Sequence, residues 1–457
     1  MQNPPDNDGS RRIFLKNSLG ACACLKTETL LPKFLQRTWY ATGIGEQNVK
    51  RGQPMSAALS ATALRRMHEA MSGYVERAEV PGLVTLVSHR DETNVEALGT
   101  RSIGEAGSQA VRRDTIFRIA SMTKPITAIA TMILVEESKL QLDEPVDRLL
   151  PELANRKVLK RVDGPLDDTI PAKRPITVRD LLTFQLGLGL LLAPPDTHPI
   201  IKAMYEREVG VTPFPAQMPH PPEEWMRRLG TLPLMYQPGE SWLYNTGSDV
   251  LGVLIARASG QRLETFFRER IFEPLGMKNT GFSVPADKLD RFVACYSFNP
   301  QTRKLDLTDP PNGQWSHSPA FPSGASGLVS TVDDYLAFAR MMLNKGAFSQ
   351  KRLVTASSIE MMTANQLTPD QQHMGRLILG ENTGWGFGVS VLTKPDGLAT
   401  RAGRYGWNGG LGSSWWNDPN ESLTAIILTE RTYESADPPN VIKDFWKFAY
   451  QSIGVQS

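Results

Sequence analysis

Residues with strand patterns occur near both ends of this chain, and most of the residues between them have helical patterns. Apolar or alternating runs predict strands at 83–88, 94–98, 386–391, 413–416 and 423–429. Strands this far apart indicate one sheet domain built by both chain ends, with a helical domain inserted between them. We therefore predict an α/β (α+β) fold. Its parts are a tail (1–55), a sheet domain (56–145 and 315–457) and a mainly helical insertion (146–314).

Helices are predicted where apolar residues recur every three or four positions. Leu59, Ala63, Leu64, Met67 and Met71 follow this spacing near the start of the folded region. The predicted helices cover 57–77, 121–140, 149–159, 178–183, 248–258, 263–272, 332–345 and 440–452.

A proline-dense stretch interrupts the helical region. Ten of the 33 prolines fall within 191–240, so this stretch cannot form one regular element. Loops of this length inside a compact domain are usually functional. Apolar residues such as Ile200, Phe214 and Trp225 favour a lid, at about 186–240, over an apolar site. The alternative is an inert surface excursion.

The composition, with 40% hydrophobic and 21% charged residues, is that of an ordinary globular protein. The 50 Lys and Arg residues against 48 Asp and Glu residues give a formal charge of +2, so no overall field favours nucleic acid. Three cysteines are too few for a disulfide framework, and no run of 18 apolar residues predicts a transmembrane helix.

Several catalytic classes lack their motifs. The chain has neither the G-x-x-x-x-G-K-[ST] pattern of nucleotide enzymes nor the G-x-S-x-G pattern of α/β-hydrolases. His68 and Glu69 begin an H-E-x-x-H pattern, but Ser72 stands where the second histidine is needed. None of the six histidines pairs at ligand spacing, so each is expected to be a surface or packed side chain.

An arginine pair lies near the N-terminus. Arg11 and Arg12, followed by Phe-Leu-Lys at 14–16, resemble the twin-arginine export signal, which predicts a periplasmic or exported protein. The apolar segment that should follow, 17–25, is short and starts with Asn17 and a serine. A disordered tail with a chance arginine pair, on a cytoplasmic protein, is the alternative.

Ser121 and Lys124 form the one S-x-x-K pattern of the chain, at the start of a predicted helix. Residues three apart share a helix face, so the amine can approach the hydroxyl. A serine hydroxyl needs a base to become a nucleophile, and lysine serves as that base only when it is neutral. The Ser121 amide, at a helix N-terminus, can also face an oxyanion. Taken alone, the pattern fits a capping serine with an exposed lysine better.

Two further clusters supply candidate partners. Tyr244 lies on a predicted loop before a helix, where a phenol near a lysine could shuttle a proton. In the glycine-rich segment 406–416, the Gly410 amide could be a second oxyanion donor opposite Ser121. The alternatives are a buried structural tyrosine and a glycine-rich hairpin.

The order and spacing of these three clusters resemble the serine β-lactamase and penicillin-binding-protein superfamily. Within it, class C β-lactamases and family VIII carboxylesterases look most similar. The resemblance covers about 75–455 and includes the segments 117–120, 274–277 and 324–331. It implies a β-lactamase-like fold, with an antiparallel sheet flanked by helices and a mainly helical inserted domain.

The resemblance also implies roles for individual residues. Ser121 is the nucleophile, Lys124 its base or proton relay, and Tyr244 shares the proton transfer. Which of Lys124 and Tyr244 takes the first proton is disputed for the superfamily. The amides of Ser121 and Gly410 form the oxyanion hole. The resemblance implies neither a metal nor an organic cofactor.

The chain departs from the superfamily pattern at the third motif, which usually begins with lysine. Trp407 stands there, and an indole cannot neutralise a substrate carboxylate. This predicts weaker recognition of β-lactams and D-Ala peptides and better tolerance of neutral esters, although a charge from Arg401, Arg404 or Lys394 could compensate. The apolar segment 182–188, where relatives often have His-Thr-Ser, predicts an apolar wall. The predicted substrate contacts are Trp407, Asn408, Gly409 and Asn245.

Three hypotheses for function follow. The leading one is a carboxylesterase that cleaves small-molecule esters through an acyl-enzyme on Ser121. The second is a β-lactamase, a D,D-peptidase or a D-amino-acid amidase. The third is an inactive homologue that binds or senses a ligand, against which the intact Ser121, Lys124 and Tyr244 argue.

Overall fold

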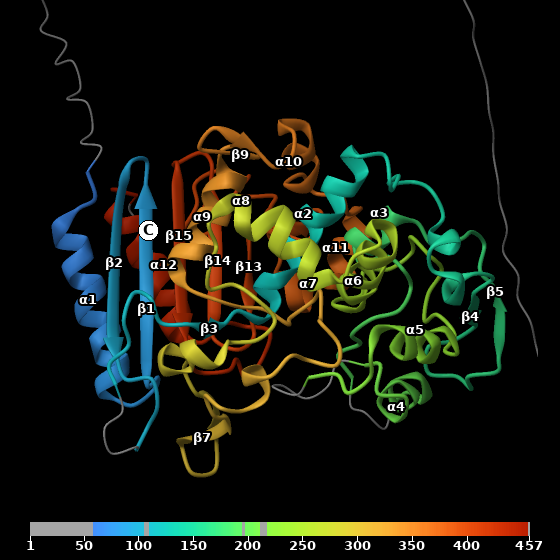
Figure 1. Cartoon of the computed structure of the whole chain (residues 1–457), viewed down its shortest axis with the longest axis horizontal. Helices are drawn as coiled ribbons and strands as arrows, with labels where there is room; N and C mark the ends of the chain where they lie inside the picture. The colour runs from blue at the N-terminus through green and yellow to red at the C-terminus, as the bar shows by residue number, and fades with distance from the viewer. Residues whose placement is uncertain (1–57, 105–108, 194–196, 211–216, 456–457) are drawn as a thin grey trace, which may run out of the picture. The chain divides into compact units, whose positions relative to one another are not determined.

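A seven-stranded antiparallel sheet, built by both ends of the chain, forms the centre of the fold (Figure 1). The structure is a computed structural model, which describes residues 58–104, 109–193, 197–210 and 217–455. In the order β11-β12-β13-β14-β15-β1-β2, the C-terminal strands join the N-terminal hairpin. Their bounds are β1 Gly82–His89, β2 Glu92–Gly99, β11 Thr383–Trp385, β12 Ser390–Leu392, β13 Tyr405–Gly409, β14 Ser413–Asp418 and β15 Leu423–Thr429. The prediction of one sheet from both chain ends is confirmed.

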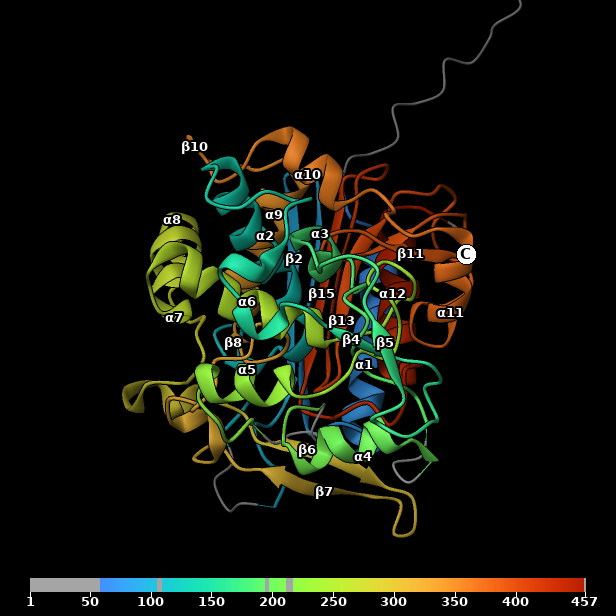
Figure 2. The same cartoon turned by 90° about the vertical axis from the view of Figure 1, so that its right-hand side faces the viewer.

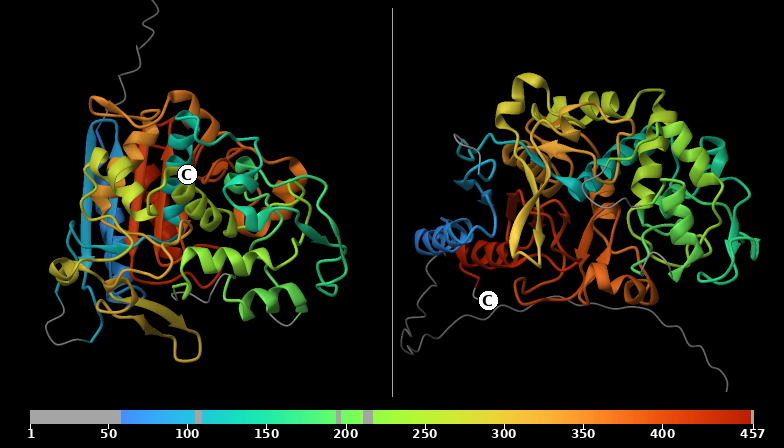
Figure 3. Two further views of the ribbon diagram at one scale, coloured as in Figure 1. Left: turned by 45° about the vertical axis from the view of Figure 1, so that its right-hand side comes forward. Right: turned by 90° about the horizontal axis from the view of Figure 1, so that it is seen from below.

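Helices cover both faces of this sheet. On one face, α1 (Ala61–Glu76) and α12 (Asn440–Ser452) lie side by side, as Figure 3 shows from below. On the other face lie α2 (Thr123–Glu136) and α9 (Val332–Leu343). Every residue of β1 is buried, because alternate side chains point into the two layers.

The helical region lies on the side of the sheet away from β2 (Figure 1), and it faces the viewer in Figure 2. It includes α3 Val178–Leu182, α4 Pro199–Glu206, α5 Pro222–Gly230, α6 Thr246–Ser259, α7 Leu263–Phe267, the π-helical turn η5 Arg268–Phe272 and α8 Glu273–Leu275. Two more helices, α10 Ala356–Met362 and α11 Pro369–Leu379, precede β11. The domain boundaries at 145 and 315 stay predictions.

Short elements connect these layers. Two-stranded pairs are β3 Phe117–Arg118 with β8 Val329–Ser330, β4 Lys157–Leu159 with β5 Thr169–Pro171, β6 Cys295–Asn299 with β7 Lys304–Asp309, and β9 Ala347–Phe348 with β10 Lys351–Arg352. The 3₁₀ turns are η1 Ala120–Met122, η2 Val146–Arg148, η3 Pro151–Leu153, η6 Ala286–Arg291 and η7 Gln314–Ser316. The β3–β8 pair matters most for function, because its strand β3 immediately precedes η1 and α2 in the chain.

Several helix boundaries follow from capping residues in the sequence. Ser60 and Thr331 cap α1 and α9 by accepting hydrogen bonds from backbone amides of the first turn. Gly260 ends α6 in a left-handed conformation with φ 70°. Pro199 and Pro222 are the first residues of α4 and α5. At this position the backbone N–H that proline lacks would have no partner within the helix. The proline-dense stretch therefore contains two helices.

Two predicted elements are wrong in detail. The predicted helix at 149–159 is a 3₁₀ turn followed by β4, because Pro151 starts a new turn and Val158 pairs with Ile170 of β5. The predicted strand at 386–391 is a turn leading into β12, in which Gly388 adopts a φ of 73°. A Cβ on Gly388 would lie 2.6 Å from the Ala128 methyl group, so α2 packs directly on this turn.

The predicted export signal and Cys22 and Cys24 lie outside the described residues. Cys295 is buried and forms no disulfide. Among the described helices, none combines the length and the apolar character that crossing a bilayer requires.

Candidate active site

Ser121 lies in the 3₁₀ turn immediately before α2 and is 5% exposed. The residue before it, Ala120, has a φ of 43°, a conformation that is uncommon for residues with a side chain and is typical of functional turns. The Tyr335 hydroxyl on α9 donates a hydrogen bond to the Met122 carbonyl at 2.9 Å. This turn therefore holds the Ser121 hydroxyl at the start of α2, as the sequence predicts.

The end of β13 packs against the backbone just before Ser121. A Cβ on Gly409 would lie 2.3 Å from the Ile119 carbonyl oxygen, so only glycine allows this approach. The Ser413 hydroxyl, at the start of β14, donates a hydrogen bond to the same oxygen at 3.0 Å. The central sheet thereby fixes the nucleophile turn, and the Gly410 backbone follows directly after the contact.

Lys124 is buried and makes three hydrogen bonds with its amine. Nζ lies 3.0 Å from Ser121 Oγ, 2.8 Å from Asn245 Oδ1 and 3.0 Å from the Ala325 carbonyl oxygen. Burial lowers the pKa of Lys124 to about 7, and the carboxylate of Asp249 opposes this shift. A substantial neutral fraction is therefore present near pH 7.

The partners of Lys124 determine where its lone pair points. The Asn245 amide oxygen and the Ala325 carbonyl can only accept hydrogen bonds, so they take two N–H groups. A neutral amine has two N–H groups and one lone pair, which remains for the Ser121 hydroxyl. This geometry matches that of a base poised to take the serine proton.

Tyr244 and Asn245 form a strained turn before α6. Asn245 has φ 83° and ψ −64°, and the Thr246 amide donates to the Tyr244 carbonyl at 3.2 Å, which together define a γ-turn of the rare positive-φ kind. The sequence predicts Asn245 as a substrate contact, but the structure places its amide oxygen on Lys124. The Leu190 amide, from the predicted lid, also donates to the Tyr244 carbonyl at 2.8 Å.

The phenol oxygen of Tyr244 lies between the nucleophile and Trp407. The Trp407 indole Nε1 donates a hydrogen bond to Tyr244 Oη at 2.7 Å, and a further hydrogen bond joins Tyr244 to Ser121. The Lys124 amine lies 4.5 Å from the centre of the Tyr244 ring. Burial raises the pKa of Tyr244 well above its usual value, against the opposing effect of its hydrogen bonds with Ser121 and Trp407. Tyr244 is thus a neutral phenol at neutral pH.

Aromatic side chains surround Tyr244. The rings of Trp385 and Trp407 pack edge to face with their centres 4.9 Å apart, and the rings of Phe184 and Tyr244 pack edge to face with their centres 5.6 Å apart. Trp242 completes the cluster. The structure thus gives this part of the site the apolar character that the sequence predicts from 182–188.

The remaining predicted residues separate along β13. Gly409 contacts the nucleophile turn, and the Gly410 amide, just beyond the strand, has no backbone hydrogen-bond partner within the described residues. Asn408 lies on the opposite face from Trp407, because side chains alternate along a strand. Its Oδ1 accepts hydrogen bonds from Ser414 Oγ at 2.7 Å and Trp416 Nε1 at 3.1 Å. The predicted substrate contact of Asn408 can therefore involve only its backbone.

Arg404 does not supply a compensating charge at Trp407. Its guanidinium donates to Asp396 and lies 5.2 Å from the Trp416 ring, on the α12 face of the sheet. The Oη of Tyr244 therefore faces an indole where the superfamily has a lysine.

Sequence reasoning missed Asp249, a buried carboxyl group on α6. Its Oδ1 accepts hydrogen bonds from Ser323 Oγ at 2.6 Å and from the Ala325 amide at 3.1 Å. The Ala325 carbonyl, in turn, holds Lys124. An acidic residue at the start of the apolar run 250–255 is unusual enough to have been a signal.

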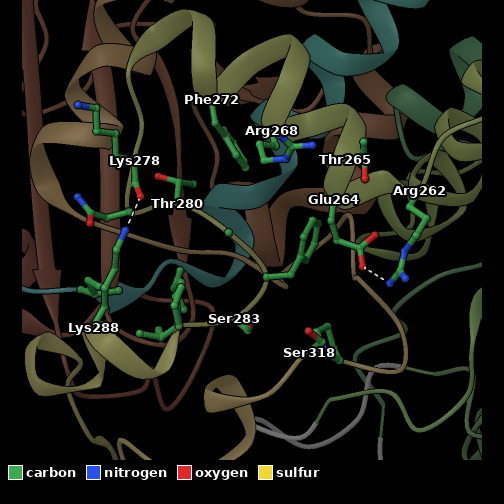
Figure 4. A pocket seen from close by; sticks show the side chains of 18 residues that line it. Arg262, Glu264, Thr265, Arg268, Phe272, Lys278, Thr280, Ser283, Lys288 and Ser318 are labelled. Carbon is green, nitrogen blue, oxygen red and sulfur yellow. Dashed lines mark hydrogen bonds and ion pairs between the residues drawn. The ribbon is translucent and has the colours of Figure 1, made fainter.

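The pocket drawn in Figure 4 is a separate cavity. Its lining comes from α7, from η5 and from residues 278–285, and includes Arg268 and Lys278. Its lining includes none of Ser121, Lys124 and Tyr244. The candidate active site, which is defined by the hydrogen bonds of these three residues, is therefore a different site. Within the described parts of the chain, no group of three or more His, Cys, Asp or Glu side chains could hold a metal ion.

An antiparallel sheet flanked by helices, with a buried Ser-Lys-Tyr group beside its strand β13, defines a class of serine enzymes. The chain belongs to the Beta-lactamase family, whose model matches residues 67–443. Protein Rv1367c of Mycobacterium tuberculosis is 37% identical over 358 residues, covering 76% of this chain and 85% of that protein. Esterase EstB of Burkholderia gladioli is 30% identical over 409 residues, covering 85% of this chain and 96% of the esterase.

Solved structures share the fold. EstCE1, described as a hydrolase with promiscuous acyltransferase activity, matches with a TM-score of 0.71 at 22% identity, over 85% of this chain and 98% of its own. The penicillin-binding protein homologue from Pyrococcus abyssi matches with a TM-score of 0.60 at 22% identity, over 85% of this chain and 76% of its own. The β-lactamase-like fold implied by the sequence resemblance is thus confirmed.

Proposed function

We propose that this protein is a serine ester hydrolase that forms an acyl-enzyme on Ser121. The observation that carries the proposal is the buried Lys124 amine, 3.0 Å from Ser121 Oγ and 4.5 Å from the centre of the Tyr244 ring, whose hydroxyl accepts a hydrogen bond from the Trp407 indole. The family and the similarity to esterase EstB support the same activity.

Acylation begins when Ser121 Oγ attacks the ester carbonyl carbon. The hydroxyl proton passes to Lys124 Nζ as the new O–C bond forms, and the carbonyl electrons move onto the oxygen to give a tetrahedral oxyanion. The amides of Ser121 and Gly410 are proposed to hold this oxyanion. The C–O bond to the alcohol then breaks, and the Lys124 proton leaves with the alkoxide as free alcohol.

Lys124, rather than Tyr244, is proposed to take the first proton. Burial lowers the pKa of Lys124 to about 7, whereas it raises the pKa of Tyr244, so the amine is the base available near neutral pH. Tyr244 instead relays protons. In deacylation it is proposed to orient a water molecule, whose oxygen forms a bond to the acyl carbon. The bond from that carbon to Ser121 Oγ then breaks, and the water proton passes through this network to Ser121 as the acid is released.

Trp407 favours neutral esters over β-lactams as substrates. A β-lactam or a D-Ala peptide brings a carboxylate, and the Trp407 nitrogen already donates its one N–H to Tyr244. Faster hydrolysis of nitrocefin than of simple esters would reverse this order of candidates.

The test is hydrolysis of p-nitrophenyl acetate and butyrate by the purified protein, with Ser121→Ala as the matched variant. We expect turnover by the wild-type protein and none by Ser121→Ala, with unchanged circular dichroism. A fluorophosphonate probe should label the wild-type protein and not the variant. A wild-type protein that neither turns over esters nor takes the label would instead support the inactive binding homologue.

Export through the twin-arginine pathway is a separate proposal, and it rests on Arg11 and Arg12 alone. Residues 1–40 fused to a reporter should carry it out of the cytoplasm, and an Arg11→Lys, Arg12→Lys fusion should not. Retention of both fusions in the cytoplasm would refute it.

A further inference from the structure

A buried carboxyl group that the proposed mechanism does not use lies one peptide unit away from the catalytic lysine. Asp249 is 2% exposed, in the first turn of α6, and Lys124 is fully buried in α2. α6 packs directly against α2. Two ionisable groups buried this deeply influence each other strongly, because little water screens them.

The peptide of Ala325 joins the two groups. Its amide donates to Asp249 Oδ1 at 3.1 Å, and its carbonyl oxygen accepts from Lys124 Nζ at 3.0 Å. Ser323 adds a second hydrogen bond to the same carboxyl oxygen at 2.6 Å. The 323–325 segment also approaches α6 closely, since a Cβ on Gly324 would lie 2.4 Å from the Ser248 carbonyl oxygen. Asp249 thus anchors the segment that orients Lys124.

We propose that Asp249 is a positioning residue that sets the protonation state of Lys124 through this anchored peptide, an inference that rests on the proposed function. Its negative charge stabilises the ammonium group that Lys124 becomes when it takes the Ser121 proton. Its hydrogen bonds hold the Ala325 carbonyl in place, which keeps the Lys124 lone pair directed at Ser121.

The electrostatics agree with this role. Burial raises the pKa of Asp249, and its hydrogen bond with Ser323 and the charge of Lys124 oppose the rise. The charge of Asp249 also acts on Tyr244. Of the elements packed against α6, α2 contributes Lys124, while α3 carries Asp180 and α7 carries Glu264, each held in an ion pair with an arginine. Asp249 is therefore the acidic group coupled to Lys124.

The decisive variant is Asp249→Asn, which keeps an oxygen for Ser323 and Ala325 but removes the charge. Loss of the charge makes Lys124 easier to deprotonate. The acidic limb of the kcat/KM profile should therefore move to lower pH by about one unit, the low end of the effect of an opposite charge at close range. The plateau should also fall, because the ammonium group formed in acylation loses its partner.

Ser323→Ala is the second variant, and it retains the Asp249 carboxyl group. Loss of its hydrogen bond raises the pKa of Asp249 further, so the acidic limb should move in the same direction by less. Asp334→Asn is the matched control, because Asp334 is also a buried, hydrogen-bonded acid but sits on α9 against Asn279. We expect it to lower stability and to leave the limb where it is.

The pH profile is measured twice, by ester turnover and by the rate of fluorophosphonate labelling of Ser121. If the wild-type protein shows neither reaction, the proposed function fails. If the wild-type protein reacts and the limbs of Asp249→Asn and Ser323→Ala coincide with the wild-type limb, only the role of Asp249 is refuted. A limb that also moves in Asp334→Asn would equally refute it.

Discussion

Replacing Trp407 with phenylalanine tests the chain of hydrogen bonds at its outer end. The change keeps an aromatic ring in the cluster and removes the N–H that lies 2.7 Å from Tyr244 Oη. In the resting enzyme Tyr244 is a neutral phenol, so the lost hydrogen bond costs about 1 kcal/mol of stability, plus the packing of the missing ring atoms.

The cost in the transition state is expected to be larger. When Tyr244 relays a proton, its oxygen gains negative charge, and a hydrogen bond to a charged partner is worth about 1.5–3 kcal/mol. Because about 1 kcal/mol is already lost in the resting enzyme, the barrier should rise by about 0.5–2 kcal/mol. At about 1.4 kcal/mol for each factor of ten, Trp407→Phe should lower kcat about 2- to 30-fold. The assay is steady-state hydrolysis of p-nitrophenyl butyrate, together with thermal unfolding.

Trp385→Phe is the matched control, because Trp385 belongs to the same aromatic cluster and is also buried. Its indole donates to the Leu182 carbonyl at 3.2 Å, away from Tyr244 Oη. We expect it to lose stability but to keep kcat within about threefold of the wild-type value, since the hydrogen bond it loses is to a neutral group. Equal losses of kcat in the two variants would refute a specific role for the Trp407 N–H.

Three further outcomes follow from the same geometry. The wild-type kcat/KM should rise with pH through about 7, because Lys124 must lose its proton to act; a flat profile from pH 5 to 9 would contradict this. Asn245→Gly should relieve the strain of a φ of 83° and raise the melting temperature by a few degrees, while activity falls at least tenfold through loss of the Lys124 contact; unchanged activity would show that this contact is dispensable. Gly409→Ala should destabilise the protein by about 2 kcal/mol or more and abolish labelling of Ser121, because its methyl group would displace the Ile119 carbonyl; wild-type stability in urea would be inconsistent with that contact.

The sequence predicts the reacting groups well, two of them from local geometry and the third from the family resemblance. Ser121 and Lys124 lie three residues apart at a helix start, and their proximity follows from helix spacing alone. Tyr244 lies far away in sequence, and its placement came from the family resemblance rather than from any local pattern. The structure brings all three together as expected.

What the sequence could not supply is the set of contacts made across elements. The position of Asp249 before an apolar run signals a buried acid, but its partners are known only once the 323–325 segment folds over it. Asn245 looks like a substrate contact because nothing in its neighbourhood reveals that α2 will place Lys124 beside it. Asn408 was assigned to the site with its neighbour Trp407, although strand alternation sends the two side chains to opposite faces.

The same distinction explains the fold. The 83–88 and 440–452 segments were predicted almost to the residue, since each has a clear period and a turn or proline at its border. The 149–159 segment failed because its apolar spacing suits a helix, while a distant pairing partner makes its end a strand.

The pairing of β1 with β15 places Leu83 opposite Thr429, so β1 finds this partner only after more than three hundred further residues have left the ribosome. The turn at Ile119 likewise packs against Gly409, which is synthesised much later. A nascent or truncated chain therefore already carries the reactive serine and lysine but lacks the wall that shapes them into a catalyst. Competence to attack an ester should therefore appear only once β13 to β15 have been synthesised, and shorter translation products should not hydrolyse esters.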